Sequence, residues 1–276
     1  DNTSLISIGG AISYAGKAGI GAGLARAENL GSVRAVIEDL GTDQSKLRLY
    51  GDVTVSANNQ LSIISVAGTL AAGGGTGVSA AGSVSLVNIA LEESATVARS
   101  YIDMNADSSV PTHDLTVSAK QQVFFVSVAG AVAFGGQAGF GIGFAYTTHS
   151  GSVNATLLNS HVDDADDIKV TAQSANSSYM IGFGLGSSAP VGIAGSAAVL
   201  RNEQLSMASV VGSQLSAADD VDVTSTITST SLMVAGGVVR GAATVLGAAV
   251  GTQIVSADGT TLSLIHISEP TRLGMI

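Results

Sequence analysis

A tandem repeat is the feature that most constrains what this chain can fold into. A short alternating segment occurs four times, and each copy is followed by a long, nearly uncharged tract of Gly, Ala, Ser and Val. The four copies are VTVSA at Val53, LTVSA at Leu115, IKVTA at Ile168 and VDVTS at Val221. Their starts are 62, 53 and 53 residues apart. Such spacing indicates one structural unit copied in tandem, with each copy packing against its neighbours. Function is therefore to be sought in an array rather than in one pocket.

The array covers most of the chain. Residues 1–50 form a partial copy, because Ile8 to Ile37 resembles Val66 to Ile102 in texture and order. Full copies begin at about residues 51, 113, 166 and 219, so the tandem repeats occupy residues 1–261.

The last segment has a different character from the repeats. Leu262 to Arg272 reads LSLIHISEPTR, which resembles the translation of a transposon sequencing adapter. We therefore expect residues 262–276 to be a non-native tail and exclude them from the fold prediction. The genuine chain is then expected to continue beyond the array.

Residue size alternates with a period of two in the apolar tracts. In the second full copy, the even positions from Val126 to Tyr146 are mostly large, whereas the odd positions from Ser127 to Ala145 are mostly Gly, Ala or Ser. Period two indicates β-strand. We expect the bulky face to supply the hydrophobic core, and the bare face to let a second sheet or backbone approach closely.

Turn-forming residues interrupt each tract near its middle, which predicts two strands joined by a sharp turn. These interruptions are Gly16-Lys17, Gly73 to Thr76, Gly135 to Gln137 and Ser187 to Pro190. A third alternating piece (Ala95 to Ile102 in the first full copy) and an acidic loop follow. The prediction is an all-β fold, a repetitive β-solenoid of the parallel β-helix kind with Gly/Ala-rich strands. Stacked antiparallel β-hairpin repeats are the alternative, because alternation is the same in both geometries.

Membrane helices are a competing interpretation of the apolar tracts. Leu61 to Ala90 and Val123 to Thr148 carry no charge and exceed the roughly 20 residues that a helix needs to cross a bilayer. Their period is two rather than 3.6, however, and glycine at alternate positions costs a helix about 1 kcal/mol each. Acidic rather than basic residues flank them. Strands are therefore favoured.

Composition excludes several classes of function. The chain is 46% hydrophobic but only 4% aromatic and 12% charged, it has no cysteine, and its formal charge is −10. Without cysteine there is neither a disulfide framework nor a thiolate metal site. The 11 Lys and Arg residues are scattered, which argues against a nucleic-acid partner because phosphate binding needs clustered cations.

The acidic loops are the one candidate metal site. Calcium takes six to eight oxygens from carboxylate-rich loops, and the weighed ligands are Asp163, Asp164, Asp166, Asp167, Asp219 and Asp220, with Asp222 nearby. Asp is also a routine turn residue, and these positions lack the Gly-x-Asp spacing of calcium-binding β-rolls. We favour the turn role and expect no resident metal and no cofactor.

No other motif predicts catalysis or ligand binding. His113, His149 and His161 lie near loop-like stretches without zinc-ligand spacing, and His266 falls in the tail. The run Gly139 to Gly143 superficially resembles a phosphate loop, but it lacks the following Lys-Ser/Thr and a helix. No serine occupies the Gly-x-Ser-x-Gly context of a hydrolase. We therefore expect a protein that is not an enzyme.

The order GDVTVSA, Gly/Ala tract, ATVARSYI, acidic loop and DLTVSA resembles the repeat regions of large secreted bacterial filamentous adhesins and leukotoxin-like exoproteins. The resemblance covers Ile6 to about Ser256. It implies a β-solenoid stalk, secreted or displayed on the bacterial cell surface outside the outer membrane. Its partners would be host or neighbouring-cell surface components, besides adjacent repeats of the same chain.

The favoured function is thus structural and adhesive, with loops such as Asp103 to His113 and His161 to Asp167 making the contacts. A membrane-interacting or pore-forming segment is the alternative, because the tracts are uncharged. A polysaccharide-active enzyme on a β-helix is the second alternative. It would need carboxylates or basic residues in register on one exposed strip, and the anchor segments show none.

Overall fold

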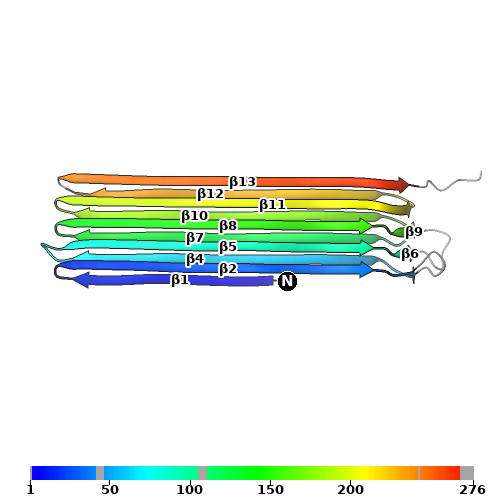
Figure 1. Ribbon diagram of the computed structural model, residues 1–276, viewed down its shortest axis with the longest axis horizontal. Helices are drawn as coiled ribbons and strands as arrows, with labels where there is room; N and C mark the ends of the chain where they lie inside the picture. Colours follow the sequence, from blue (N-terminus) through cyan, green and yellow to red (C-terminus); the bar gives the residue numbers. More distant parts are fainter. Residues whose placement is uncertain (1, 42–46, 105–110, 242, 268–276) are drawn as a thin grey trace, which may run out of the picture.

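The computed structural model describes residues 2–41, 47–104, 111–241 and 243–267, with side chains placed through residue 260. These residues form strands, turns and bends only, and none of them is helical. Ten strands are long and three are short. The long strands lie side by side and are stacked in coils, and the N-terminal copy is at one end of the stack (Figure 1). This part of the chain accordingly has no helix that is long and apolar enough to cross a membrane.

The first sheet contains the first long strand of every copy, in the order β1-β4-β7-β10-β12. Its strands are β1 (Asn2–Ala15), β4 (Val53–Gly73), β7 (Leu115–Gly135), β10 (Ile168–Ser188) and β12 (Val221–Arg240). All of its strand pairs are parallel.

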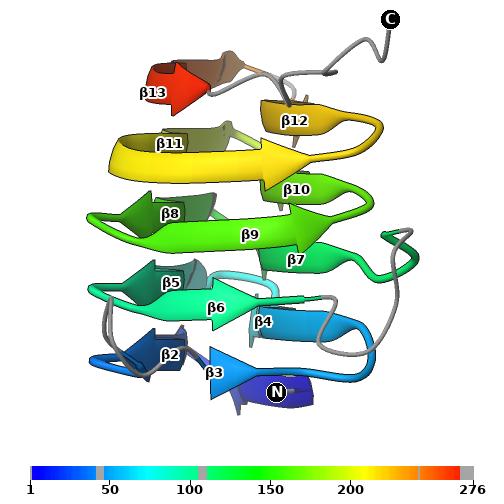
Figure 2. The ribbon, with the colours of Figure 1, turned by 90° about the vertical axis from the view of Figure 1, so that its right-hand side faces the viewer.

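The second sheet contains the other long strands and the three short ones, in the order β2-β5-β8-β11-β9-β6-β3, with β13 also paired to β11. Its long strands are β2 (Ala18–Glu38), β5 (Val78–Ala98), β8 (Ala138–Leu158), β11 (Val191–Ala217) and β13 (Thr244–Ile267). The short strands β3 (Leu47–Arg48), β6 (Tyr101–Asp103) and β9 (His161–Ala165) form a third side at the end of the coils away from the turns (Figure 2).

The spacing of the repeats in the sequence matches the register in which the strands pair. Val53 pairs with Leu115, Leu115 with Ile168, and Ile168 with Val221, so each copy lies directly on the one before it. The two long strands of one copy belong to different sheets, and the turn between them is therefore an arc rather than a hairpin. The predicted parallel β-solenoid is confirmed, and the antiparallel alternative is wrong for the described strands.

Two sequence-based boundaries differ from the structure. The third alternating piece from Ala95 belongs to the second long strand as far as Ala98, and only Tyr101–Asp103 forms a separate strand. In the partial copy, Ile8 pairs with Val66 as expected, but Ile37 pairs with Val97 rather than with Ile102.

The tail predicted to be non-native begins inside β13. The backbone of Leu262 to Ile267 pairs with β11 between Ser209 and Leu215, and residues 268–276 lie outside the described residues. Backbone pairing uses only N–H and C=O groups, so it does not depend on the origin of a segment.

Each coil is much wider than the height that it adds to the stack. A strand of 21 residues such as β4 extends for about 70 Å, and neighbouring coils are about 4.8 Å apart. The breadth of the array is therefore set by the strand length, and each added copy increases the height of the stack by only about 4.8 Å.

Bulky side chains face outward in half of the molecule, which contradicts the expectation that they form the core. We call the part of each long strand next to the turn the turn-proximal half; in β4 and β5 it comprises residues 64–72 and 78–86. There the small residues, such as Ala129 and Ala131, are buried, whereas Ile12 is 83% exposed and Ile142 is 55% exposed.

The reason for this reversal is the distance between the two sheets. Near the turns only two sheets face each other, and they approach to backbone contact: a Cβ added to Gly141 would lie 2.1 Å from the carbonyl oxygen of Leu185. The innermost cluster there consists of Ala71, Ala81, Ala131 and Ala133. In the other half of the strands, the distal half, the third side widens the coil. Larger residues such as Leu115, Ile168 and Leu215 fill it.

The corner between the second long strand and the third side is built in the same way in successive copies. Asp39, Arg99, Asn159 and Gly212 each occupy it with positive φ, a conformation that favours Gly and tolerates Asn and Asp. Serine follows in three of them. The backbone N–H of Ser100 donates to Ser160 Oγ, and the N–H of Ser160 donates to Ser213 Oγ. This ladder of serines fixes the corner from copy to copy.

Candidate functional site

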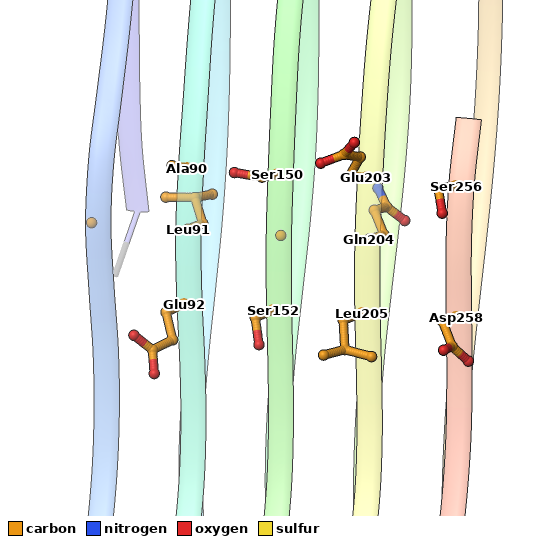
Figure 3. A pocket seen from close by; sticks show the side chains of 12 residues that line it. Ala90, Leu91, Glu92, Ser150, Ser152, Glu203, Gln204, Leu205, Ser256 and Asp258 are labelled. Atoms are coloured by element: carbon orange, nitrogen blue, oxygen red, sulfur yellow. The ribbon is translucent and has the colours of Figure 1, made fainter. Parts of the chain in front are cut away.

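A trough crosses the outer face of the second sheet; we call it the polar trough because carboxylate and hydroxyl groups surround it (Figure 3). Its volume is about 550 Å³. The small residues Ala90, Ser150 and Ser256 leave the space, because the stacked copies place them in one row across the strands. Gly31 lies in the adjacent row, paired with Leu91. Glu92, Glu203, Leu205, Ser152, Ser256 and Asp258 surround it.

Two of the three carboxylates at the polar trough are engaged with arginines. Arg34 donates to both carboxylate oxygens of Glu92 at 3.2 Å. Arg201 donates to Glu203 Oε1 at 2.6 and 2.8 Å. These side chains are exposed to solvent, so such pairs contribute little to stability. The trough thus offers hydroxyl and carboxylate acceptors in rows, which suits contact with a polar surface.

The aspartates weighed as calcium ligands are separated by the structure. Asp163 and Asp164 lie in β9, and Asp163 accepts hydrogen bonds from Tyr101 Oη at 3.0 Å and pairs with His161 Nε2 at 2.7 Å. Asp164 is exposed and has positive φ. Asp166 and Asp219 follow at the next corner and are joined through their backbones. Within the described residues, no three His, Asp or Glu side chains are grouped closely enough to hold a metal ion.

A ladder of aspartates precedes the first long strand of each copy. The backbone N–H of Asp114 donates to Asp52 Oδ1 at 3.0 Å, that of Asp167 to Asp114 Oδ1 at 3.2 Å, and that of Asp220 to Asp167 Oδ1 at 3.1 Å. Lys169 Nζ lies 2.5 Å from Asp167 Oδ2. The hydrogen bond from Lys169 is the main reason why the pKa of Asp167 lies below its ordinary value. Asp167 and Asp220 therefore act in copy-to-copy bonding.

We expect Asp167→Ala to lower the urea concentration at the midpoint of unfolding, because it removes one hydrogen bond to a backbone N–H and a partly exposed ion pair. Asp219→Ala is the matched control, since Asp219 is exposed and joins Asp166 only through its backbone. Urea denaturation with and without calcium is the measurement. A calcium-dependent gain in stability that is lost in Asp167→Ala would show that these aspartates bind the ion instead.

The histidines are in three different environments. His113 Nδ1 lies 3.7 Å from Asp52 Oδ1. The ring of His161 stacks on Tyr101 with centroids 4.1 Å apart. His149, which we expected near a loop, is instead buried inside β8. The loop prediction for His149 is wrong because its parity places it on the inner face, among residues such as Ala145 and Val153.

A buried carboxylate lies between the two sheets in the distal half. Glu93 is fully buried; its Oε1 accepts a hydrogen bond from Asn59 Nδ2 at 2.7 Å, and its Oε2 accepts one from Gln121 Nε2 at 2.6 Å. Burial raises the pKa of Glu93 to about 7, and the two hydrogen bonds oppose that shift only in part. Gly151 makes room for Gln121, because a Cβ there would lie 2.4 Å from Gln121 Oε1.

A second buried polar group surrounds His149. Its Nδ1 lies 2.8 Å from Asn202 Oδ1 and 3.2 Å from Asn176 Nδ2, and its Nε2 has no hydrogen-bond partner. Burial lowers the pKa of His149 to about 4, which the contact with Asn202 opposes only in part. The imidazole is therefore neutral at physiological pH.

The sequence prediction missed both buried polar groups, although a signal for them was present. Glu93 has the parity of the inner-face residues Leu91 and Ala95, and Gln121 has that of Val117 and Val123. A polar residue in the inner phase of a strand must be buried.

The array presents outward rows of side chains at matching heights in successive copies, an open polar trough and two enclosed polar groups. No protein-family model, curated protein or solved structure matches this chain.

Proposed function

We propose that this chain is a structural and adhesive segment of a large exoprotein that is secreted or displayed on the bacterial cell surface. The observation that carries the proposal is the in-register stack. Each copy presents the same outward positions at the same height, so that the polar trough and its flanking rows extend over β2, β5, β8, β11 and β13. Such rows give several contacts at regular spacing to an extended partner, which is the basis of avidity.

The proportions of the coil modify the expected stalk. Each copy of 53 residues or more adds only about 4.8 Å along the stack, so the repeats build length inefficiently. They build a broad face instead, because each strand runs across it. A face about 70 Å across and free of deep clefts can lie against another cell's surface, so we assign adhesion to the strand faces and not to the loops alone.

The polar half of the outer face of the second sheet is the proposed contact. Ser, Thr and Asn are frequent at its outward positions, as in Ser94 and Thr96 of β5 and in Thr148, Ser150 and Asn154 of β8. Hydroxyl and amide groups form hydrogen bonds with glycans and with polar protein surfaces alike. The net charge of −10 makes a nucleic-acid partner unfavourable.

Bead adhesion tests this proposal. Beads coated with the chain should bind to cultured epithelial cells or to Gram-negative bacterial cells more than uncoated beads do. Ser150→Arg with Ser152→Arg, which fills the polar trough, should lower this adhesion about tenfold. Thr224→Arg with Thr226→Arg, on the exposed face of β12, is the matched control and should keep it. Adhesion no greater than that of uncoated beads would overturn the proposal.

A further inference from the structure

The outer surface of the turn-proximal half is apolar on both sheets. On the first sheet the outward rows are Ile6-Ile64-Val126-Tyr179-Leu232, Ile8-Val66-Val128-Ile181-Val234 and Ile12-Leu70-Val132-Leu185-Val238. On the second sheet they are Ile20-Ala80-Phe140-Ile193-Leu246 and Leu24-Val84-Phe144-Ala197-Val250. None of these residues is charged, and many are exposed to solvent.

A groove runs across one of these apolar faces. Gly10, Gly68 and Gly130 form its floor between two aliphatic rows, and Phe183 closes one end. Its volume is about 610 Å³. Nothing in the described chain lies over a Cβ added at Gly68 or Gly130. The groove is therefore open and lined almost entirely by hydrocarbon.

The apolar surface ends at the same height, to within one row, on the two opposite faces. On the first sheet the row beyond Ile64 is Ser4-Ser62-Phe124-Ser177-Thr230. On the second sheet the row of Leu86 includes Arg26 and Thr252, and the next row is Glu28-Asn88-Thr148-Arg201-Ile254. A single protein partner would contact one outer face, so it would not explain why the apolar surface ends at nearly the same level on the outer faces of both sheets. A boundary between two solvents does explain it.

The side chains inside the same half are small and partly polar. In a water-soluble protein the large apolar side chains are usually inside instead. Ser85 Oγ lies 2.8 Å from Ser65 Oγ and 3.0 Å from Ser127 Oγ, and Thr69 donates to the carbonyl oxygen of Gly82 at 2.8 Å. In water, leaving an Ile or Phe side chain outside forgoes about 1.5–3 kcal/mol each. In hydrocarbon that driving force vanishes, and small residues that permit close backbone packing are preferred.

We propose that the turn-proximal half inserts into the hydrocarbon core of a lipid bilayer, with the turns leading and the strands crossing the bilayer. Residues 64–72 of β4 extend for about 27 Å at ~3.3 Å per residue, which is close to the ~30 Å of a bilayer core. Within the stack, backbone N–H and C=O groups pair with the copies on either side. Inner copies therefore satisfy the requirement that no backbone group be left unpaired in lipid.

A second copy of the chain fits these observations less well. One two-fold interface would cover one apolar face and leave the opposite face in water. Lipid covers both faces and the groove at once. The inference does not depend on adhesion through the polar trough, which lies in the distal half.

Tryptophan placement tests insertion directly, because the chain contains no tryptophan. Phe134→Trp puts the reporter on the outer face of the turn-proximal half, and Leu205→Trp puts it on the outer face of the distal half. With vesicles of zwitterionic phosphatidylcholine, the emission of the first variant should shift to shorter wavelength and be quenched by brominated acyl chains. The second should not change. Quenching of neither variant, or of both equally, would overturn the proposal.

Charge substitution provides the second arm. Ile142→Asp with Ile181→Asp changes exposed outer residues, and Leu205→Asp changes a residue of comparable exposure (40%) in the distal half. Flotation with the same vesicles should fall at least about tenfold for the first variant and stay unchanged for the second. Circular dichroism confirms that both remain strand-rich. Dimers that dissociate in the first variant, without flotation of the wild type, would favour a second copy and overturn the lipid assignment.

Discussion

Replacing Gly141 by alanine is expected to destabilise the array by about 3 kcal/mol, the upper end for overpacking a core. The added Cβ would lie 2.1 Å from the carbonyl oxygen of Leu185 and 2.6 Å from its carbonyl carbon. Both are backbone atoms of the opposite sheet, so no side chain can rotate to relieve the contact. The two sheets must move apart, which also breaks contacts in the copies above and below.

Gly130→Ala is the matched control for this substitution. Gly130 lies in the neighbouring long strand, but it faces outward, and an added Cβ there meets nothing within 4 Å. Alanine loses less backbone entropy on folding than glycine, so this variant should be neutral or more stable by up to about 0.5–1 kcal/mol. Urea denaturation followed by circular dichroism measures both. Equal effects of the two substitutions would mean that the sheets do not meet at backbone distance in the turn-proximal half.

Removing one of the two buried titratable groups, Glu93 or His149, is expected to reveal the pH dependence of stability that comes from the other group. In the wild type the two contributions oppose each other. The pKa of Glu93 is raised from 4.5 to about 7 when the chain folds, so its contribution to stability is present at low pH and is lost as pH rises through that interval. The pKa of His149 is lowered from 6.5 to about 4, so its contribution is present at neutral pH and is lost as pH falls. Between about pH 4.5 and 6.5 the two effects oppose each other.

In Glu93→Gln, the rise in stability that His149 contributes between about pH 4 and 6.5 should therefore no longer be offset by Glu93. In His149→Gln, the fall in stability that Glu93 contributes between about pH 4.5 and 7 should no longer be offset by His149. Each change amounts to about 3 kcal/mol, because each pKa differs from its ordinary value by about 2.5 at 1.36 kcal/mol per pKa unit. Urea denaturation across this pH range measures both variants and the wild type. In the difference from the wild type the shared titration of surface carboxylates cancels and the removed group remains, so the difference should rise with pH from about 4.5 to 7 for Glu93→Gln and fall with rising pH from about 4 to 6.5 for His149→Gln.

The difference curves have a clear failing outcome. Two flat curves would show that Glu93 and His149 titrate normally in the folded chain and are hydrated rather than buried. NMR titration of the His149 ring then serves as an independent check, because its pKa in the folded protein should be about 4.

The strands and their register were predictable from particular residues. The anchors at Val53, Leu115 and Ile168 are paired in the structure with the register that their spacing predicts. The spacing alone was enough to predict these pairs, because a parallel stack of copies aligns equivalent residues of successive repeats. The choice between hairpin and arc was not predictable, since alternation along a strand is the same whichever sheet its partner joins.

The aspartate positions were recognised, but their role follows from contacts that sequence does not show. Asp114 and Asp167 are 53 residues apart, and only the stacked register brings the carboxylate of one to the backbone N–H of the other. The buried pair of Glu93 and Gln121 has the same origin, because their atoms meet across two sheets.

The period, the alternation of large and small residues and the set of copies that stack on one another all follow from the order of the residues. Which of the two strand faces is inside depends on how the sheets pack. Alternation defines two faces and does not assign them, because the assignment depends on how far apart the sheets lie. Where the turns hold two sheets at backbone distance, only Gly, Ala and Ser fit between them, and Ile12 and Ile142 face outward. Where the third side widens the coil, Leu115 and Ile168 fill it instead.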